Sequence, residues 1–163
     1  MPEPIISDMA WCWWTRPRAT RIGDAAYFGA LDSEGRMLTA RLDLKTGASE
    51  KFHLAGFERD DHNNPALLAV EGKPLVAFYS RHDADDALRV RISSQPLDLS
   101  AWGEEQVLRF NGMTCYAQVH ALGDELARTV AAPVLPHASA HHRDEELALV
   151  WPLSTLYALC SHA

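Results

Sequence analysis

The first segment whose residue types could do chemistry is 59–65, Arg-Asp-Asp-His-Asn-Asn-Pro, which places six polar side chains directly before an apolar run. An imidazole exchanges protons near neutral pH, and loops beside buried strands often carry function. His62 and Asn63 are therefore candidate site residues. The alternative is local, because Asp and Asn side chains readily bond to their own backbone in turns.

A second segment, 79–83 (Tyr-Ser-Arg-His-Asp), ends the most hydrophobic run of the sequence with a phenol, a guanidinium and an imidazole. A guanidinium is a good fork for carboxylate or sulfate, and a phenol or an imidazole can move a proton. We expect Tyr79, Arg81 and His82 to belong to a ligand site, although a solvated strand end would use the same residue types.

A third polar group consists of Tyr116, Gln118 and His120, which alternate with apolar residues. On a β-strand this period of two places all three side chains on one face. Such a face could line a central cleft, or it could be a solvent-facing edge.

Other polar or aromatic groups favour ordinary structural uses. The tryptophans within 11–14 could stack on sugar rings, but core packing is more common. Arg18 could bind an anion. No glycine-rich phosphate loop or Cys-x-x-Cys pair is present. The C-terminal histidines match no zinc spacing, so no metal and no cofactor are expected. These histidines are His137, His141, His142 and His162.

Composition indicates one globular domain and limits the classes of partner that the chain can bind. The chain has 163 residues, is 47% hydrophobic and carries a formal charge of −7. An acidic chain argues against general nucleic-acid binding, although a local cluster of Arg and His can still bind an anionic substrate. No run of about 18 apolar residues predicts a membrane span. No signal peptide is visible, and the cellular location stays open.

The elements that must position these residues are predicted to be β-strands. Alternating apolar residues and glycine-containing turns predict strands across 25–54, and the pattern restarts over 65–110 and again over 116–122. Repeats of short antiparallel strands with a period of about 40–50 residues are typical of propeller blades. We therefore expect an all-β fold, a partial β-propeller of two blades and the start of a third. A generic antiparallel sandwich is the alternative.

The repeat stops within the third unit, so 1–123 is expected to form the blade region and 124–163 an atypical tail. Residues 125–129 make a poor strand. Polar caps and apolar residues at helical spacing predict helix within Arg143–Val150 or Ser154–Cys160.

Strand pairing predicts where the candidate residues meet. A hairpin of 65–70 and 75–80 through the Glu71–Lys73 turn would bring His62 and His82 to the same end of a sheet. Tyr116 begins the equivalent strand of the next unit, so we expect it on a neighbouring wall.

With these motifs the chain resembles the BNR-4 repeat family, which includes the seven-bladed propeller ulvan lyases. The resemblance covers about residues 10–126, and the Asp-Asp-His-Asn and Tyr-Ser-Arg-His motifs together carry most of its specificity. The resemblance also extends to the Trp-Cys-Trp-Trp run, to the Pro-Arg-Ala that follows it, and to Ser-Ala-Trp-Gly-Glu-Glu at 100–105.

The resemblance implies a polysaccharide lyase that performs β-elimination at a uronic acid of a sulfated or acidic polysaccharide such as ulvan. That reaction needs a donor or cation on the carboxylate, a base for the C5 proton and an acid for the leaving glycosidic oxygen. The expected site comprises catalytic His62, His82 and Tyr116 and substrate-binding Asn63, Arg81, Tyr79 and Arg18.

The chain also departs from the family pattern. A seven-bladed propeller needs well over twice this length, and Arg128 lacks the aromatic context of the family's carboxylate-neutralising arginine. The expected partner is an acidic polysaccharide, with self-association through open sheet edges, no nucleic acid and no membrane. The alternative function is a non-catalytic carbohydrate-binding or interaction β module. Family members are often secreted.

Overall fold

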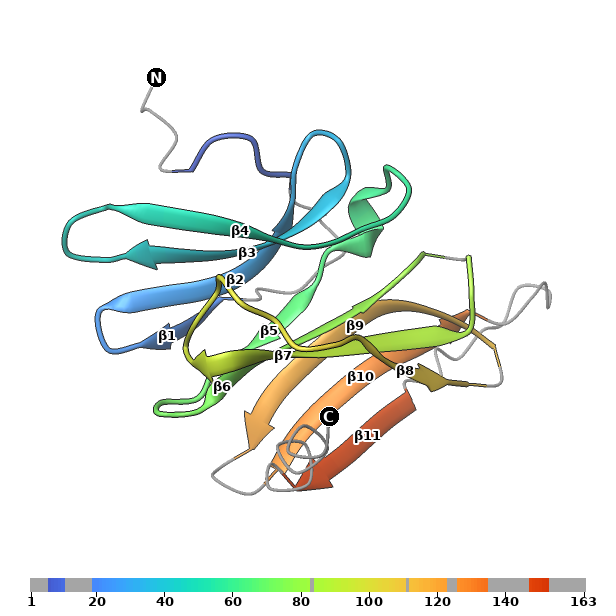
Figure 1. Cartoon of the computed structure of the whole chain (residues 1–163). Helices are drawn as coiled ribbons and strands as arrows, with labels where there is room; N and C mark the ends of the chain where they lie inside the picture. Colours follow the sequence, from blue (N-terminus) through green and yellow to red (C-terminus); the bar gives the residue numbers. More distant parts are fainter. Residues whose placement is uncertain are drawn as a thin grey trace.

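In the described part of the chain, three antiparallel β-sheets follow one another in sequence order (Figure 1). The computed structural model describes residues 6–10, 19–82, 84–110, 112–122, 126–134 and 147–152. The expected all-β class is confirmed, and so are the two neighbouring sheets expected over 25–54 and 65–110. The first sheet contains one strand more than the sequence pattern indicated, because residues 20–22 pair with 25–27.

The order of strands within each sheet follows the sequence. The first sheet contains β1 (Thr20–Ile22), β2 (Ala25–Leu31), β3 (Arg36–Asp43) and β4 (Ser49–Gly56). The second contains β5 (Ala66–Leu68), β6 (Pro74–Ser80), β7 (Ala87–Pro96) and β8 (Gln106–Arg109). The third contains β9 (Met113–Leu122), β10 (Leu126–Val134) and β11 (Leu147–Pro152). One short 3₁₀ helix, η1 (Asp61–Asn63), precedes β5.

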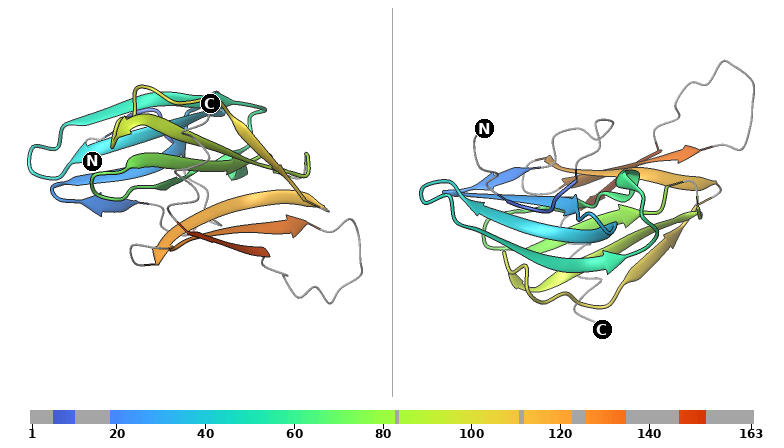
Figure 2. Two further views of the ribbon diagram at one scale, coloured as in Figure 1. Left: turned by 60° about the horizontal axis from the view of Figure 1, so that its bottom comes forward. Right: turned by 90° about the horizontal axis from the view of Figure 1, so that it is seen from above.

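Strand β6 is buried on both faces, as its nearly continuous apolar sequence predicted. Leu75, Ala77 and Tyr79 pack with residues of the first sheet. Val76 and Phe78 point the other way and pack in a cluster that includes Ala117 of β9. The second sheet therefore lies between the other two, and Figure 2 shows the third sheet crossing it on the side away from the first.

The C-terminal part of the described chain corrects one expectation. Residues 147–150 belong to strand β11, which pairs antiparallel with β10, so the helix expected within Arg143–Val150 is wrong there. A short apolar run such as Leu-Ala-Leu-Val-Trp has no periodicity that distinguishes strand from helix, and the edge of β10 supplies a partner. The poor strand expected at 125–129 is also wrong, because β10 begins at Leu126. Ser154–Cys160 lies outside the described residues.

Two glycines let the first sheet touch the segment that carries His62. A methyl group built on Gly29 of β2 would lie 2.1 Å from the carbonyl oxygen of Pro65. One built on Gly35, whose φ is +82°, would lie 2.6 Å from Cα of Arg59. Backbone therefore contacts backbone at both ends of residues 59–65, and neither contact leaves room for a side chain.

Among the described residues, no helix is long and apolar enough to cross a membrane.

Replacing Phe78 by alanine should lower the free energy of unfolding by about 3–5 kcal/mol, because the ring is fully buried between two sheets. Denaturant titration followed by tryptophan fluorescence measures this. Leu44→Ala is the control, since Leu44 is 46% exposed and its loss should change stability by less than about 0.5 kcal/mol. Equal costs for the two variants would contradict the packing described above.

Gly29→Ala should destabilise the protein by about 1–3 kcal/mol, because the new methyl group meets backbone rather than a flexible side chain. The matched control is Gly56→Ala, where nothing lies within 4 Å of the added group. Thermal unfolding of the two variants side by side makes the comparison. A Gly29→Ala protein as stable as the Gly56→Ala protein would disprove the close contact with Pro65.

Candidate functional site

Asp60 shapes the segment that presents His62. Its side chain is the N-cap of η1 and accepts a hydrogen bond from the backbone N–H of His62 at 2.9 Å. Asp is among the residues that best cap the first turn of a helix, because its oxygen satisfies an otherwise free N–H group. The Asx-rich turn expected from the sequence is therefore present, and it places His62 just before β5.

Asn63 joins the two histidine-bearing segments. Its Oδ1 accepts a hydrogen bond from the backbone N–H of His82 at 2.6 Å, and its Nδ2 donates to Glu58 at 3.4 Å. Asn63 is only 1% exposed. The side chain holds the backbone of His82 beside η1, and substrate binding by Asn63 stays a prediction.

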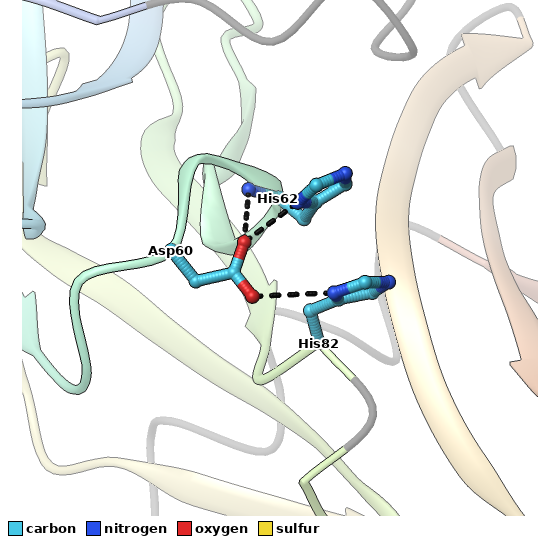
Figure 3. Close-up of side chains that lie close together, drawn as sticks. All are labelled: Asp60, His62 and His82. Carbon is cyan, nitrogen blue, oxygen red and sulfur yellow. Dashed lines mark hydrogen bonds and ion pairs between the residues drawn. The ribbon is translucent and has the colours of Figure 1, made fainter.

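The imidazoles of His62 and His82 both contact the carboxylate of Asp60. His62 Nδ1 lies 2.6 Å from Oδ1 of Asp60, and His82 Nδ1 lies 3.2 Å from Oδ2 (Figure 3). The rings are stacked, with centroids 4.2 Å apart and planes inclined by 15°. An ionised carboxylate only accepts hydrogen bonds, so each Nδ1 carries the proton it donates. In the neutral form of either ring the lone pair is then on Nε2, and Figure 3 shows both rings pointing away from Asp60.

The charge of Asp60 is well supported. Burial by itself raises the pKa of Asp60, but the hydrogen bonds from the backbone N–H of His62 and from both imidazoles outweigh it. The pKa therefore lies below its ordinary value. A carboxylate that stays ionised can hold both histidines in one tautomer and can stabilise a positive charge on either.

Tyr116 completes the group from the third sheet. Its ring centroid lies 5.5 Å from that of His62 and 5.5 Å from that of His82. The expected proximity of the three rings is thus confirmed, although their catalytic roles are a separate matter.

Tyr116 reaches the histidines from a β-bulge. Between the pairs Cys115↔Ala132 and Gln118↔Val130, β9 has one residue more than β10. Tyr116 has a φ of +54°, in the left-handed region that costs a residue with a side chain about 1–2 kcal/mol. Bulges re-aim side chains and are common beside active sites. The sequence pattern placed Tyr116 on a regular strand face and gave no sign of this.

Arg81 lies at the margin of the site. Its Nε donates to Glu58 at 2.8 Å, and its guanidinium stands 5.6 Å from the centroid of the Phe57 ring. The side chain is 36% exposed, so an anion can approach it.

Tyr79 does not reach the surface. It is fully buried and donates its hydroxyl hydrogen to Glu105 at 2.7 Å. Burial, and then that hydrogen bond, raises the pKa of Tyr79 far above its ordinary value. In this position the Tyr79 hydroxyl holds the carboxylate of Glu105, and substrate binding by Tyr79 stays a prediction. Arg18 and the tryptophans of 11–14 lie outside the described residues.

The residue that sequence reasoning missed is Asp60. The motif Asp-Asp-His contained it, but an Asp in a polar turn is usually a local cap, and capping is also what Asp60 does. Its second contact, to His82, depends on the pairing of β5 with β6 and has no local signal. Asp60, His62 and His82 also form the group of described residues whose ligand atoms, all within 4.8 Å of one another, could hold a metal ion.

Among the comparisons with known proteins, the one with solved structures supports the fold. No family model and no curated protein sequence matches the chain. Among solved structures, the chain is similar to an ulvan lyase of polysaccharide lyase family PL25, with a TM-score of 0.61 and 15% identity over 88% of this chain. It is also similar to such a lyase bound to -[GlcA(1-4)Rha3S]-, with a TM-score of 0.58 and 15% identity over 83% of this chain. The chain spans 37% and 34% of the length of these two proteins. The described structure thus has the β architecture of part of a polysaccharide lyase.

Proposed function

We propose that this chain carries the reactive surface of a lyase that cleaves an acidic polysaccharide by β-elimination at a uronic acid. The observation that carries the proposal is the convergence of two stacked imidazoles and a phenol on one point, with Asp60 behind the imidazoles. The likeness in fold to ulvan lyases supports it. In this proposal the three sheets are blades of a partial β-propeller of the BNR-4 type.

The two imidazoles and the phenol can divide among them the roles of base, acid and carboxylate-stabilising donor. A neutral imidazole whose Nδ1–H is bound to Asp60 offers its Nε2 lone pair to the C5 proton. The C–H electrons form the C4–C5 double bond as the C4–O bond breaks, and the Tyr116 hydroxyl gives its proton to the leaving oxygen. The other imidazole, in its cationic form beside Asp60, donates from Nε2 to the uronate carboxylate and stabilises the charge that develops there.

Substrate binding is proposed for the cationic side chains around this group. Arg81 is exposed enough to hold a carboxylate or sulfate, and Arg18 is proposed for the same task on sequence grounds.

Sheet edges are the basis for a second proposal about partners. In the described part of the chain, each sheet has one edge formed by its last strand, which is β4, β8 or β11. Edge strands of this kind favour pairing with another chain, so we also propose self-association.

Ulvan treated with the full chain should yield unsaturated uronate, measured by its ultraviolet absorbance. His62→Ala, His82→Ala and Tyr116→Phe should each lower kcat by about 100-fold or more, because each removes a proton-transfer or charge-stabilising group. His53→Ala is the control, since His53 is exposed on β4. A wild-type chain that binds ulvan in affinity electrophoresis without cleaving it would refute the lyase and favour a binding module.

Asp60→Asn tests the positioning of the imidazoles. The amide keeps the shape and the capping oxygen of Asp60, but it no longer enforces a proton on both Nδ1 atoms, so kcat should fall by at least about tenfold while KM changes little. Nitrogen NMR of the histidine rings should show Nδ1–H tautomers in the wild type and a mixture in the variant. Unchanged kcat together with unchanged tautomers would mean that Asp60 acts only as a cap.

A further inference from the structure

The atoms that meet at Asp60 are those that zinc prefers. They are two imidazole nitrogens and a carboxylate, and the three ligand atoms all lie within 4.8 Å of one another. Two ligands of one tetrahedral zinc ion lie roughly 3.3 Å apart, because zinc–nitrogen and zinc–oxygen bonds are about 2.0–2.2 Å long. The distance of 3.2 Å from His82 Nδ1 to Asp60 is close to this separation, and the distance of 2.6 Å from His62 Nδ1 to Asp60 must open by several tenths of an ångström.

The site is also accessible. The side chains of His62 and His82 are each 24% exposed, and that of Asp60 is 27% exposed. An ion can therefore enter from solvent without unfolding the turn. Neighbouring structure fixes all three protein groups in advance: Asp60 caps η1, His62 lies within it, and Asn63 holds the backbone of His82. A preformed set of this kind costs little ordering on binding.

From these distances we propose that Asp60, His62 and His82, with solvent as the fourth ligand, bind a divalent transition metal ion of the zinc type. Mixed nitrogen and oxygen donors distinguish this site from one for calcium or magnesium, which prefer oxygen alone. The ion takes the place that the two Nδ1 protons occupy in the metal-free protein.

Metal binding reverses the tautomer of both histidines. A neutral imidazole that gives its Nδ1 lone pair to a metal carries its proton on Nε2. The proton count of each ring is unchanged, but the Nε2 atoms become donors. This consequence rests on the proposed function: an Nε2 that holds a proton cannot remove one from C5, so the zinc-bound protein binds a uronate without eliminating from it. Zinc is thus a reversible inhibitor that acts at the ligands themselves.

Binding is tested without any substrate. Calorimetric titration of the full chain with Zn²⁺ alone should show one equivalent that is absent from Asp60→Ala and from His62→Ala/His82→Ala. Two control variants should retain it: His53→Ala, on the exposed face of β4, and His141→Ala/His142→Ala, which removes histidines of the tail. Loss of the equivalent in the tail variant, or its retention in the double histidine variant, would overturn the proposed site.

Spectroscopy of the wild-type chain tests the site even if a variant fails to fold. Co²⁺ should give the intense visible bands of a four-coordinate ion, and Zn²⁺ should move the ring protons of two histidines from Nδ1 to Nε2 in nitrogen NMR. Six-coordinate Co²⁺ bands, or unchanged tautomers at saturating Zn²⁺, would refute it.

The effect on elimination separates this inference from the function on which it rests. With ulvan as substrate, stoichiometric Zn²⁺ should reduce turnover at least tenfold, and a chelator should restore it. Zinc binding in a chain with no lyase activity refutes the proposed function and leaves the metal site standing. Full activity with zinc bound at Asp60 refutes the inhibition while leaving the lyase intact.

Discussion

One carboxylate holds the candidate site together. Asp60 caps the turn that carries His62, binds the ring of His62 and binds the ring of His82 from the end of another strand. Without this carboxylate the two stacked imidazoles would lose the acceptor that they share. The local cap and the long-range contact therefore rely on the same side chain, so the fold of the segment and the chemistry of the site cannot be changed separately.

The second sheet makes this arrangement possible because it is covered on both faces. The first sheet presses on the His62 segment through Gly29 and Gly35, and the third sheet brings Tyr116 from the opposite side. The site thus forms where three sheets meet, and each sheet contributes something different. The first supplies a rigid support, the second supplies the imidazoles and the third supplies the phenol.

The parts of the fold that were predictable from the sequence are those with a local signal. The alternation in 37–44 and the continuous apolar run in 75–80 indicated strands and burial correctly. The meeting of His62 and His82 followed from one hairpin. The strand nature of 147–152 depends on pairing with β10, which no local pattern shows. Burial of Asn63 and Tyr79 was hidden for a similar reason, since polar residues at strand ends look alike whether they face solvent or a neighbouring sheet.

The bulge in β9 makes Tyr116 an added residue in an otherwise regular strand. Thr114 is buried before it, and Ala117 is buried and Val119 packs against the core after it, so the inward-facing positions change from even to odd numbers at this point. Leaving out Tyr116 alone would restore unbroken alternation with the same side chains facing inward. The alternation of the strand does not require this residue, and its left-handed backbone is a cost to the strand. A shortened chain without it would therefore fold more readily, and selection for stability alone would be expected to delete Tyr116.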